Sequence, residues 1–155
     1  MIPDKLVEFM HGAVLAFVGT RDARLRPALT WVFGLRASPV SDEITAFVPD
    51  VEIDQTRSNL SHNGLIALTV VHPISHECYQ FKGKLAAMRP TTDEERAVQE
   101  IQRSKVDALL AKLLPGMFVG FILAPSTAIT FKVEQAFVQT PGPGAGRPLD
   151  LSKEF

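Results

Sequence analysis

The sequence predicts a mainly β protein in which six or seven short antiparallel strands form a Greek-key barrel with helical additions. Short apolar stretches recur along the chain and are separated by brief polar turns, which suits antiparallel strands. A doubly wound sheet would need a helix after nearly every strand, and only one long helical pattern occurs. At 155 residues and 46% hydrophobic content, the chain is long enough for one packed core and too short for two domains of usual size.

The first half of the chain alternates apolar stretches with polar breaks. A short helix is expected within residues 1–10, because Pro3 and Asp4 precede apolar residues at helical spacing. The polar residues 20–24 supply a hairpin turn, and residues 54–62 suit a brief helix with most of its faces polar. Four strands are expected around these features, at residues 13–19, 27–36, 43–48 and 65–71.

The second half contains the longest expected helix. Thr91 and Thr92 each have a glutamate three residues on, which is a double capping box, and apolar residues then follow at helical spacing as far as Leu113. One strand precedes this helix and two follow it, at residues 77–88, 118–123 and 128–138.

The last segment, residues 140–155, is rich in proline and glycine. Such a composition does not support a regular element, so we expect an extended or mobile tail. The expected domain organisation is one barrel over residues 1–139, followed by this tail.

Residues 15–85 carry the order strand, turn, strand, strand, short helix, strand, strand. Short motifs accompany it: Arg26-Pro27 at a hairpin exit, Asn59-Leu60, Asn63-Gly64-Leu65-Ile66-Ala67-Leu68, and Cys78-Tyr79-Gln80-Phe81-Lys82-Gly83-Lys84. Together they resemble the FMN-binding split-barrel family, of which pyridoxamine 5'-phosphate oxidase is the best-known member. The resemblance covers roughly the first two-thirds of the chain. It implies a homodimer with FMN in the cleft between the subunits.

The resemblance also implies where the FMN phosphate would lie. In the family, arginine and lysine side chains from the second strand and from the loop after the third strand hold this dianion. Counted from Arg26-Pro27, those four positions fall on Thr30, Leu35, Gln55 and Thr56, so none of the basic residues is kept. Arg36 and Arg57 each lie one residue from a lost position and could restore the charge.

The helix expected near Asp54 could also face a phosphate with its free N–H groups. Asp54 itself works against this, because as a capping residue it would occupy those donors and add negative charge. A surface helix capped by Asp54, with its first turn in solvent, is an equally good interpretation. The cofactor contacts predicted in this region are Thr30, Val48, Gln55, Thr56 and Arg57.

Two further groups of side chains are candidate flavin contacts. Trp31 is the only tryptophan and follows Thr30 in the strand that lines the family's flavin cleft, although packing in a core or an interface is the commoner role of a strand tryptophan. Cys78, Gln80 and Lys82 share one face of their strand, and Cys78 takes the register of a flavin-contacting glutamine in the family. A solvated strand face is the alternative for these three.

His72, His76 and Cys78 are residue types that bind zinc or iron. No second ligand pair accompanies them, so we expect no metal site. Haem stays an alternative cofactor, because some split-barrel relatives bind it through histidine, and a deazaflavin is another alternative to FMN.

The bulk composition limits the partners. With 17 acidic and 16 basic residues, the chain has no broad positive field for nucleic acid or an anionic membrane. The single cysteine cannot form an internal disulfide, and no signal-peptide pattern opens the sequence. The longest apolar runs are far shorter than the roughly 20 residues of a membrane helix. We therefore expect a cytoplasmic protein.

These observations lead to two hypotheses about function. The first is a homodimeric FMN-binding split barrel that acts as a flavin-dependent oxidoreductase of an unidentified small molecule. True pyridoxamine phosphate oxidase activity is not expected, because the chain end from Arg147 to Phe155 lacks the family's substrate-binding segment. The second is a non-catalytic dimeric module that binds haem or another flavin-type cofactor.

Overall fold

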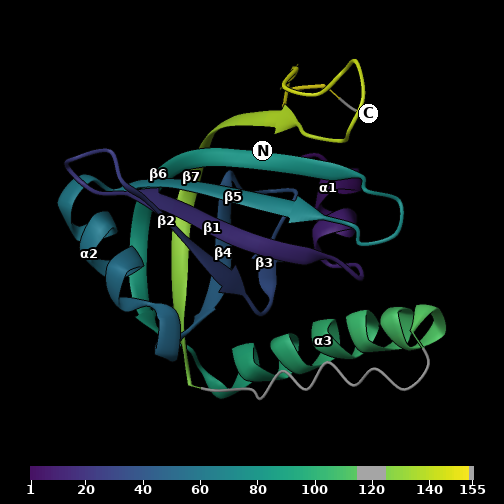
Figure 1. Cartoon of the computed structure of the whole chain (residues 1–155), viewed down its shortest axis with the longest axis horizontal. Helices are drawn as coiled ribbons and strands as arrows, with labels where there is room; N and C mark the ends of the chain where they lie inside the picture. The colour runs from purple at the N-terminus through teal and green to yellow at the C-terminus, as the bar shows by residue number, and fades with distance from the viewer. Residues whose placement is uncertain (115–124, 154–155) are drawn as a thin grey trace.

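The computed structural model describes residues 1–114 and 125–153, and Figure 1 shows its arrangement. The described strands form one antiparallel sheet in the order β2-β1-β5-β6-β7-β4-β3, with β8 paired to β7. The mainly β, antiparallel class predicted from the sequence is therefore confirmed. The elements are α1 (Asp4–Met10), β1 (Leu15–Arg21), β2 (Pro27–Val32), β3 (Leu35–Ala37), β4 (Glu43–Pro49), η1 (Asp50–Glu52), α2 (Asp54–Asn63), β5 (Leu65–Val71), β6 (Cys78–Pro90), α3 (Asp93–Leu113), β7 (Ser126–Val138) and β8 (Pro148–Leu149).

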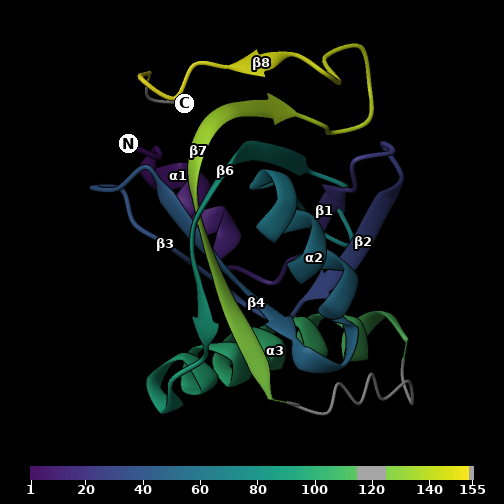
Figure 2. The same ribbon diagram turned by 90° about the vertical axis from the view of Figure 1, so that its left-hand side faces the viewer.

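The sheet curls into a partly open barrel, as the two views in Figures 1 and 2 show. The long strands β6 and β7 bend as they run from one wall to the other, and their register shifts twice, the first shift lying between Lys82 and Gly83. Gly83 is needed there, because a Cβ at this position would lie 1.8 Å from the carbonyl oxygen of Lys132. The absence of a side chain thus lets β7 approach β6 at the bend.

Backbone bonds to β4 close the other side of the barrel. Phe33 N donates to Phe47 O at 2.8 Å, and Phe47 N donates to Gly34 O at 3.0 Å. These bonds explain why residues 27–36, expected as one strand, form the two strands β2 and β3. Gly34 has a φ of 129°, a backbone conformation that side-chain-bearing residues rarely adopt, so the chain turns between the strands.

The barrel interior is apolar and is covered at both ends. The side chains of Phe81 and Phe131 are fully buried in it, whereas Phe47 is fully buried on the other face of β4, beside Gly34. Figure 1 shows α1 and α2 at opposite ends of the sheet, where they bury Leu6 and Leu60 respectively. The longest helix, α3, runs beneath β3 and β4 and forms a wall beside the β2–β3 turn.

The start of α3 differs in one respect from the expected double capping box. Thr92 is the N-cap: its Oγ1 accepts from Glu95 N at 3.2 Å, and its own N–H donates to Glu95 Oε2 at 2.9 Å. Thr91 is not part of a box, because its hydroxyl donates to Ser126 O at 3.0 Å and so joins α3 to β7. One threonine therefore caps the helix and the other anchors it to the sheet.

The C-terminal tail, expected to be extended or mobile, makes backbone contacts with the sheet. It turns back after β7, so that Phe137 pairs with Pro148, and Val138 N donates to Arg147 O at 2.9 Å. Leu149 and Leu151 pack against the core from outside. The strand expected at residues 118–123 lies outside the described residues. Among the helices that the structure describes, none has the length and apolarity that crossing a bilayer requires.

Candidate functional site

The strands β2, β1, β5, β6 and β7 have a buried inner face and a half-exposed outer face. Their register sets one side chain from each strand in line on the outer face: Phe17 is opposite both Trp31 and Thr69, Thr69 is opposite Gln80, and Gln80 is opposite Phe137. We call these five residues the aromatic row. Directly opposed side chains on one face lie about 5 Å apart, so the row is continuous across the sheet.

The contacts within the aromatic row hold its side chains in place. The rings of Phe17 and Trp31 lie 4.3 Å apart between centroids with an angle of 45°, and Trp31 is 36% exposed. Gln80 Nε2 donates to Thr69 Oγ1 at 3.2 Å. Aromatic faces flanked by an amide offer packing surface to a planar heterocycle. The structure thus places Trp31 at the surface of the barrel and not in its core.

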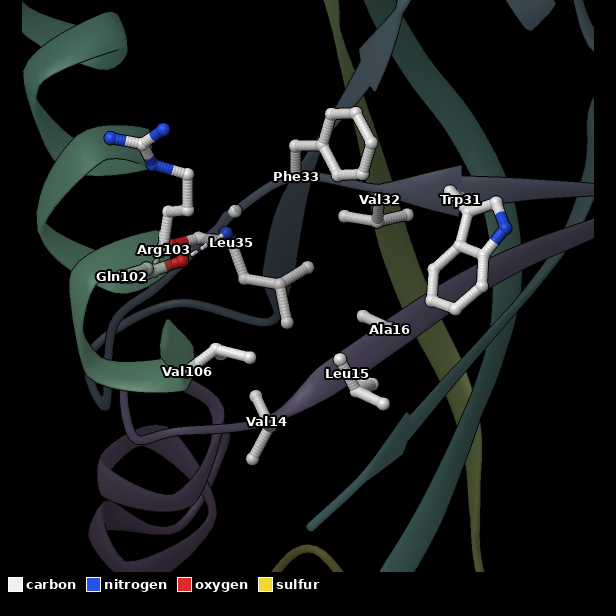
Figure 3. Close-up of a pocket in the computed structure, with 11 residues that line it drawn as sticks. Val14, Leu15, Ala16, Trp31, Val32, Phe33, Leu35, Gln102, Arg103 and Val106 are labelled. Atoms are coloured by element: carbon white, nitrogen blue, oxygen red, sulfur yellow. Dashed lines mark hydrogen bonds between the residues drawn. The ribbon is translucent and has the colours of Figure 1, made fainter. Parts of the chain in front are cut away.

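A small apolar hollow adjoins Trp31, and Figure 3 shows its lining between the sheet and α3. Val14, Val32 and Val106 contribute to its walls. Gln102 closes it on the α3 side, where its amide bonds both Leu35 N and Leu35 O at 2.7 Å. Its volume of about 50 Å³ holds a few atoms, whereas small-molecule sites usually measure about 300 to 1,000 Å³. A three-ring cofactor does not fit inside the hollow of a single chain.

Three of the predicted cofactor contacts point into the barrel. Thr30 and Thr56 are 3% and 0% exposed, and their hydroxyl oxygens bond each other at 2.8 Å. Val48 is fully buried in β4, opposite Thr127 of β7. The bond between Thr30 and Thr56 joins α2 to β2, and none of the three side chains reaches the surface in this structure.

Gln55 and Arg57 lie on the exposed side of the first turn of α2. Gln55 Nε2 donates to Asn59 Oδ1 at 2.9 Å, and Arg57 Nη2 lies 3.5 Å from Thr127 Oγ1. The N-cap is Ile53, and no side chain caps the helix, so the expectation that Asp54 is the capping residue is wrong. The first N–H groups of α2 are thus not taken by a capping side chain, and Arg57 stands next to them.

The three predicted contacts on β6 do not share one environment. Gln80 and Lys82 lie on the outer face, and Lys82 Nζ is 5.0 Å from the centre of the Phe137 ring. Cys78 is 7% exposed, and its backbone N–H donates to Thr140 Oγ1 at 2.9 Å, at the start of the tail. Burial raises the pKa of the Cys78 thiol, so it stays protonated at neutral pH.

The predicted residues therefore fall into three groups. The structure brings Trp31, Gln80 and Lys82 to the outer face, places Gln55 and Arg57 at the start of α2, and buries the remaining four. Sequence reasoning missed the other members of the aromatic row, Phe17, Thr69 and Phe137. Their alternation with buried neighbours was visible, but the strand register that aligns them was not.

His72, considered above as a metal ligand, is used within its own turn. Its Nδ1 accepts N–H groups from Ile74 at 3.4 Å and from Ser75 at 3.1 Å. The lone pair of Nδ1 is thus used by the backbone of the turn. Within residues 1–114 and 125–153, no three histidine, cysteine or acidic side chains form a cluster that could hold a metal ion.

No family model matches the chain, and no curated protein matches its sequence. Solved structures do match. The tagged HupZ protein of Group A Streptococcus has a TM-score of 0.59 at 21% identity, covering 94% of this chain and 100% of that one. An F420 reductase has a TM-score of 0.56 at 12% identity, covering 87% and 98% of the two chains.

A pyridoxamine 5'-phosphate oxidase-related, FMN binding protein from Nostoc punctiforme has a TM-score of 0.51 at 12% identity, covering 90% of this chain and 84% of that one. These matches extend over nearly the whole described chain, and at such identities they establish the fold. The chain has the split-barrel fold of the pyridoxamine 5'-phosphate oxidase-like, FMN-binding structures.

Proposed function

We propose that this chain is a homodimeric flavin-binding protein that acts as a flavin-dependent oxidoreductase of a small molecule other than pyridoxamine 5'-phosphate. The aromatic row carries the proposal, because it offers a planar ring an aromatic surface in an otherwise regular sheet. The fold is shared with an FMN binding protein and with an F420 reductase, which supports a flavin or deazaflavin as the cofactor class.

The proposed dimer follows from what a single chain leaves uncovered. Leu29 is 72% exposed and Trp31 is 36% exposed on the outer face, and the hollow beside Trp31 is too small for the cofactor. A second copy packed against this face would bury these side chains and supply the missing wall of the site. Light scattering coupled to size exclusion tests this step, and a well-folded monomer of 17.0 kDa at micromolar concentration would contradict it.

The residues present fit a flavin in two places. Trp31 and Phe17 offer stacking surface, and the Gln80 amide is the hydrogen-bonding group in the same row. Arg57 and the uncapped start of α2 offer a positive charge and N–H groups to a phosphate. When bound, the flavin supplies the electron or hydride transfer, while the chain holds and orients the ring and its phosphate.

The phosphate contact is tested by Arg57→Ala. Loss of one charge-assisted donor weakens binding by about 1.5 to 3 kcal/mol, which is roughly ten- to hundredfold. Isothermal titration should therefore show this loss for FMN and almost none for riboflavin, which has no phosphate. Arg24→Ala, in the exposed β1–β2 turn, is the matched control and should leave both affinities unchanged. An equal loss for FMN and riboflavin would mean that Arg57 acts through folding.

A specific observation favours a second candidate function, a non-catalytic dimeric module for haem or another flavin-type cofactor. Thr30 and Thr56, at two of the positions where the family has basic phosphate ligands, are buried and bonded to each other. Leu35, at a third, is also buried. A visible spectrum of the purified protein discriminates between the candidates, because FMN, deazaflavin and haem absorb at different wavelengths.

A further inference from the structure

A groove runs over the outer face next to the aromatic row, at the end of β1 that leads into the β1–β2 turn. Residues of β1, β5, β6 and β7 line it, and its volume is about 410 Å³, which is within the usual range for small-molecule sites. Gly19 and Ala67 form its floor. A Cβ placed on Gly19 would have Ala67 O, at 3.7 Å, as its nearest neighbour, so the space above the floor is open.

Two positively charged side chains line this groove, Arg21 from β1 and Lys82 from β6. Arg21 Nη1 donates to the backbone oxygen of Asp22 at 3.3 Å, while the Asp22 carboxylate is engaged by Arg26 at 2.7 Å. Lys82 rests over the Phe137 ring. Neither Arg21 nor Lys82 has a carboxylate within 4.0 Å in the described part of the chain.

The acidic residue of the groove does not cancel these charges. Glu134 Oε1 lies 3.5 Å from Lys84 Nζ, so that pair is neutral together. Arg21 and Lys82 thus leave a local excess of two positive charges over an uncharged floor. An oxyanion is the ligand that such a pair attracts most strongly.

The register shows that both side chains can reach one ligand. Gly19 is opposite Ala67, and Ala67 is opposite Lys82, so Lys82 is two strands away from β1, roughly 10 Å. Arg21 lies two residues beyond Gly19 and faces the same side of β1. Both side chains therefore border this floor, Arg21 from β1 and Lys82 from β6.

We propose that this groove binds a small oxyanion, a phosphate or carboxylate, through Arg21 and Lys82, and that this anion is part of the substrate on which the flavin acts. The oxyanion site stands on the groove and its charges alone. The assignment to the substrate rests on the proposed function, in which the cofactor phosphate is held at the start of α2 and the flavin ring on the aromatic row.

The first experiment uses inorganic phosphate as the probe. Titration of the ¹⁵N-labelled full chain should produce saturable amide shifts centred on Gly19, Ala67 and Gly83. Arg21→Gln and Lys82→Gln should each weaken this binding by about tenfold or more, because each removes a charge-assisted donor. The matched controls Arg24→Gln, in the adjacent turn, and Lys5→Gln, an exposed lysine of α1, should bind phosphate as the parent does.

The variant Gly19→Val tests the groove by filling it, while Arg21 and Lys82 keep their charges. It fills the floor of the groove, so phosphate binding should be lost while thermal unfolding shows an intact fold. Absence of saturable shifts in the parent, or equal binding by Arg21→Gln, Lys82→Gln and the controls, would overturn the oxyanion site.

The second experiment separates a substrate anion from the cofactor phosphate. Affinities for FMN and riboflavin are measured in the parent and in the Arg21→Gln variant, and both should stay unchanged. A selective loss of FMN affinity would overturn the substrate assignment, because the groove would then hold the cofactor phosphate. Phosphate binding in the groove of a parent that binds no flavin would support the oxyanion site and would contradict the proposed function instead.

Discussion

Glu95 holds the start of α3, the helix that lines one side of the hollow beside Trp31. Replacing Glu95 by glutamine tests how much its contacts contribute to the stability of the fold. The carboxylate is 1% exposed and accepts two bonds from Arg89, each at 2.8 Å, and one from Thr92 N at 2.9 Å. Arg36 Nη1 lies 3.4 Å from Oε1. The bonds from Arg89, with the helix-cap bond and the nearby charges, lower the pKa of Glu95 to about 2.

The magnitude follows from this pKa shift. A fall from 4.5 to about 2 corresponds to roughly 3 kcal/mol of stability at pH 7. Glutamine keeps one acceptor oxygen, and Arg89 and Arg36 are half exposed, so they can return to water instead of staying buried without a partner. The free energy of unfolding should therefore fall by about 2 kcal/mol in Glu95→Gln, which lowers the melting temperature by about 4 to 8 °C.

Thermal unfolding followed by circular dichroism, at pH 7 and then between pH 4.5 and 2, measures the loss of stability in Glu95→Gln. Because the folded pKa is depressed, the unfolded chain takes up the proton first as the pH falls, and the contribution of Glu95 is lost from about pH 4.5 downward. Glu95→Gln should lack that part of the acid destabilisation. Glu94→Gln, exposed in the same helical turn, is the control and should melt with the parent. A Glu95→Gln variant that melts within a degree of the parent, or that keeps its full acid dependence, would refute the reasoning.

Three further predictions concern stability. Gly83→Ala should lose about 3 kcal/mol or fail to fold, since the new methyl group meets Lys132 O at 1.8 Å, and an unchanged denaturation midpoint would contradict this. His11 Nε2 accepts from Ala37 N at 3.2 Å, and the pKa of His11 is lowered mainly by burial. Because the unfolded chain then binds the proton more readily, the stability of the fold should decrease as the pH drops below 6.5. The variant His11→Gln, compared by urea unfolding at several pH values, should show a smaller fall; an equal fall would exclude His11 as its source. Truncation after Gln139 removes the β8 pairing and should lower the melting temperature by about 4 °C. An unchanged melting temperature would mean that the tail contacts contribute nothing to the stability of the fold.

The fold could be predicted from the sequence because local signals agreed with the final structure. Alternation in β6 placed Phe81 inside and Lys82 outside, as observed. The wrong predictions concern positions where tertiary contacts determine where a strand ends or which residue caps a helix. Gly34 ends β2 because its backbone bonds to β4, and Thr91 bonds Ser126 of a distant strand instead of capping its own helix. Neither partner is visible from local periodicity.

The candidate site was less predictable, because it depends on alignment between strands. The family resemblance and strand alternation singled out Trp31, Gln80 and Lys82 one strand at a time. They could not show that Phe17 and Phe137 complete one row with Trp31 and Gln80, because register is set by long-range pairing. For the same reason the sequence did not show that Thr30 is buried. Its hydroxyl was expected to contact the cofactor, whereas in the structure it bonds Thr56 inside the barrel.

The visible difference spectrum of FMN titrated with the purified chain tests the central proposal most directly. Addition of the chain should produce a saturable shift of the flavin bands. Trp31→Ala should weaken binding by about three- to tenfold, because a stacked aromatic pair contributes roughly 0.5 to 1.5 kcal/mol beyond its buried area. An FMN spectrum that does not change on adding the parent chain would contradict the account, and so would FMN binding that is equally strong in Trp31→Ala.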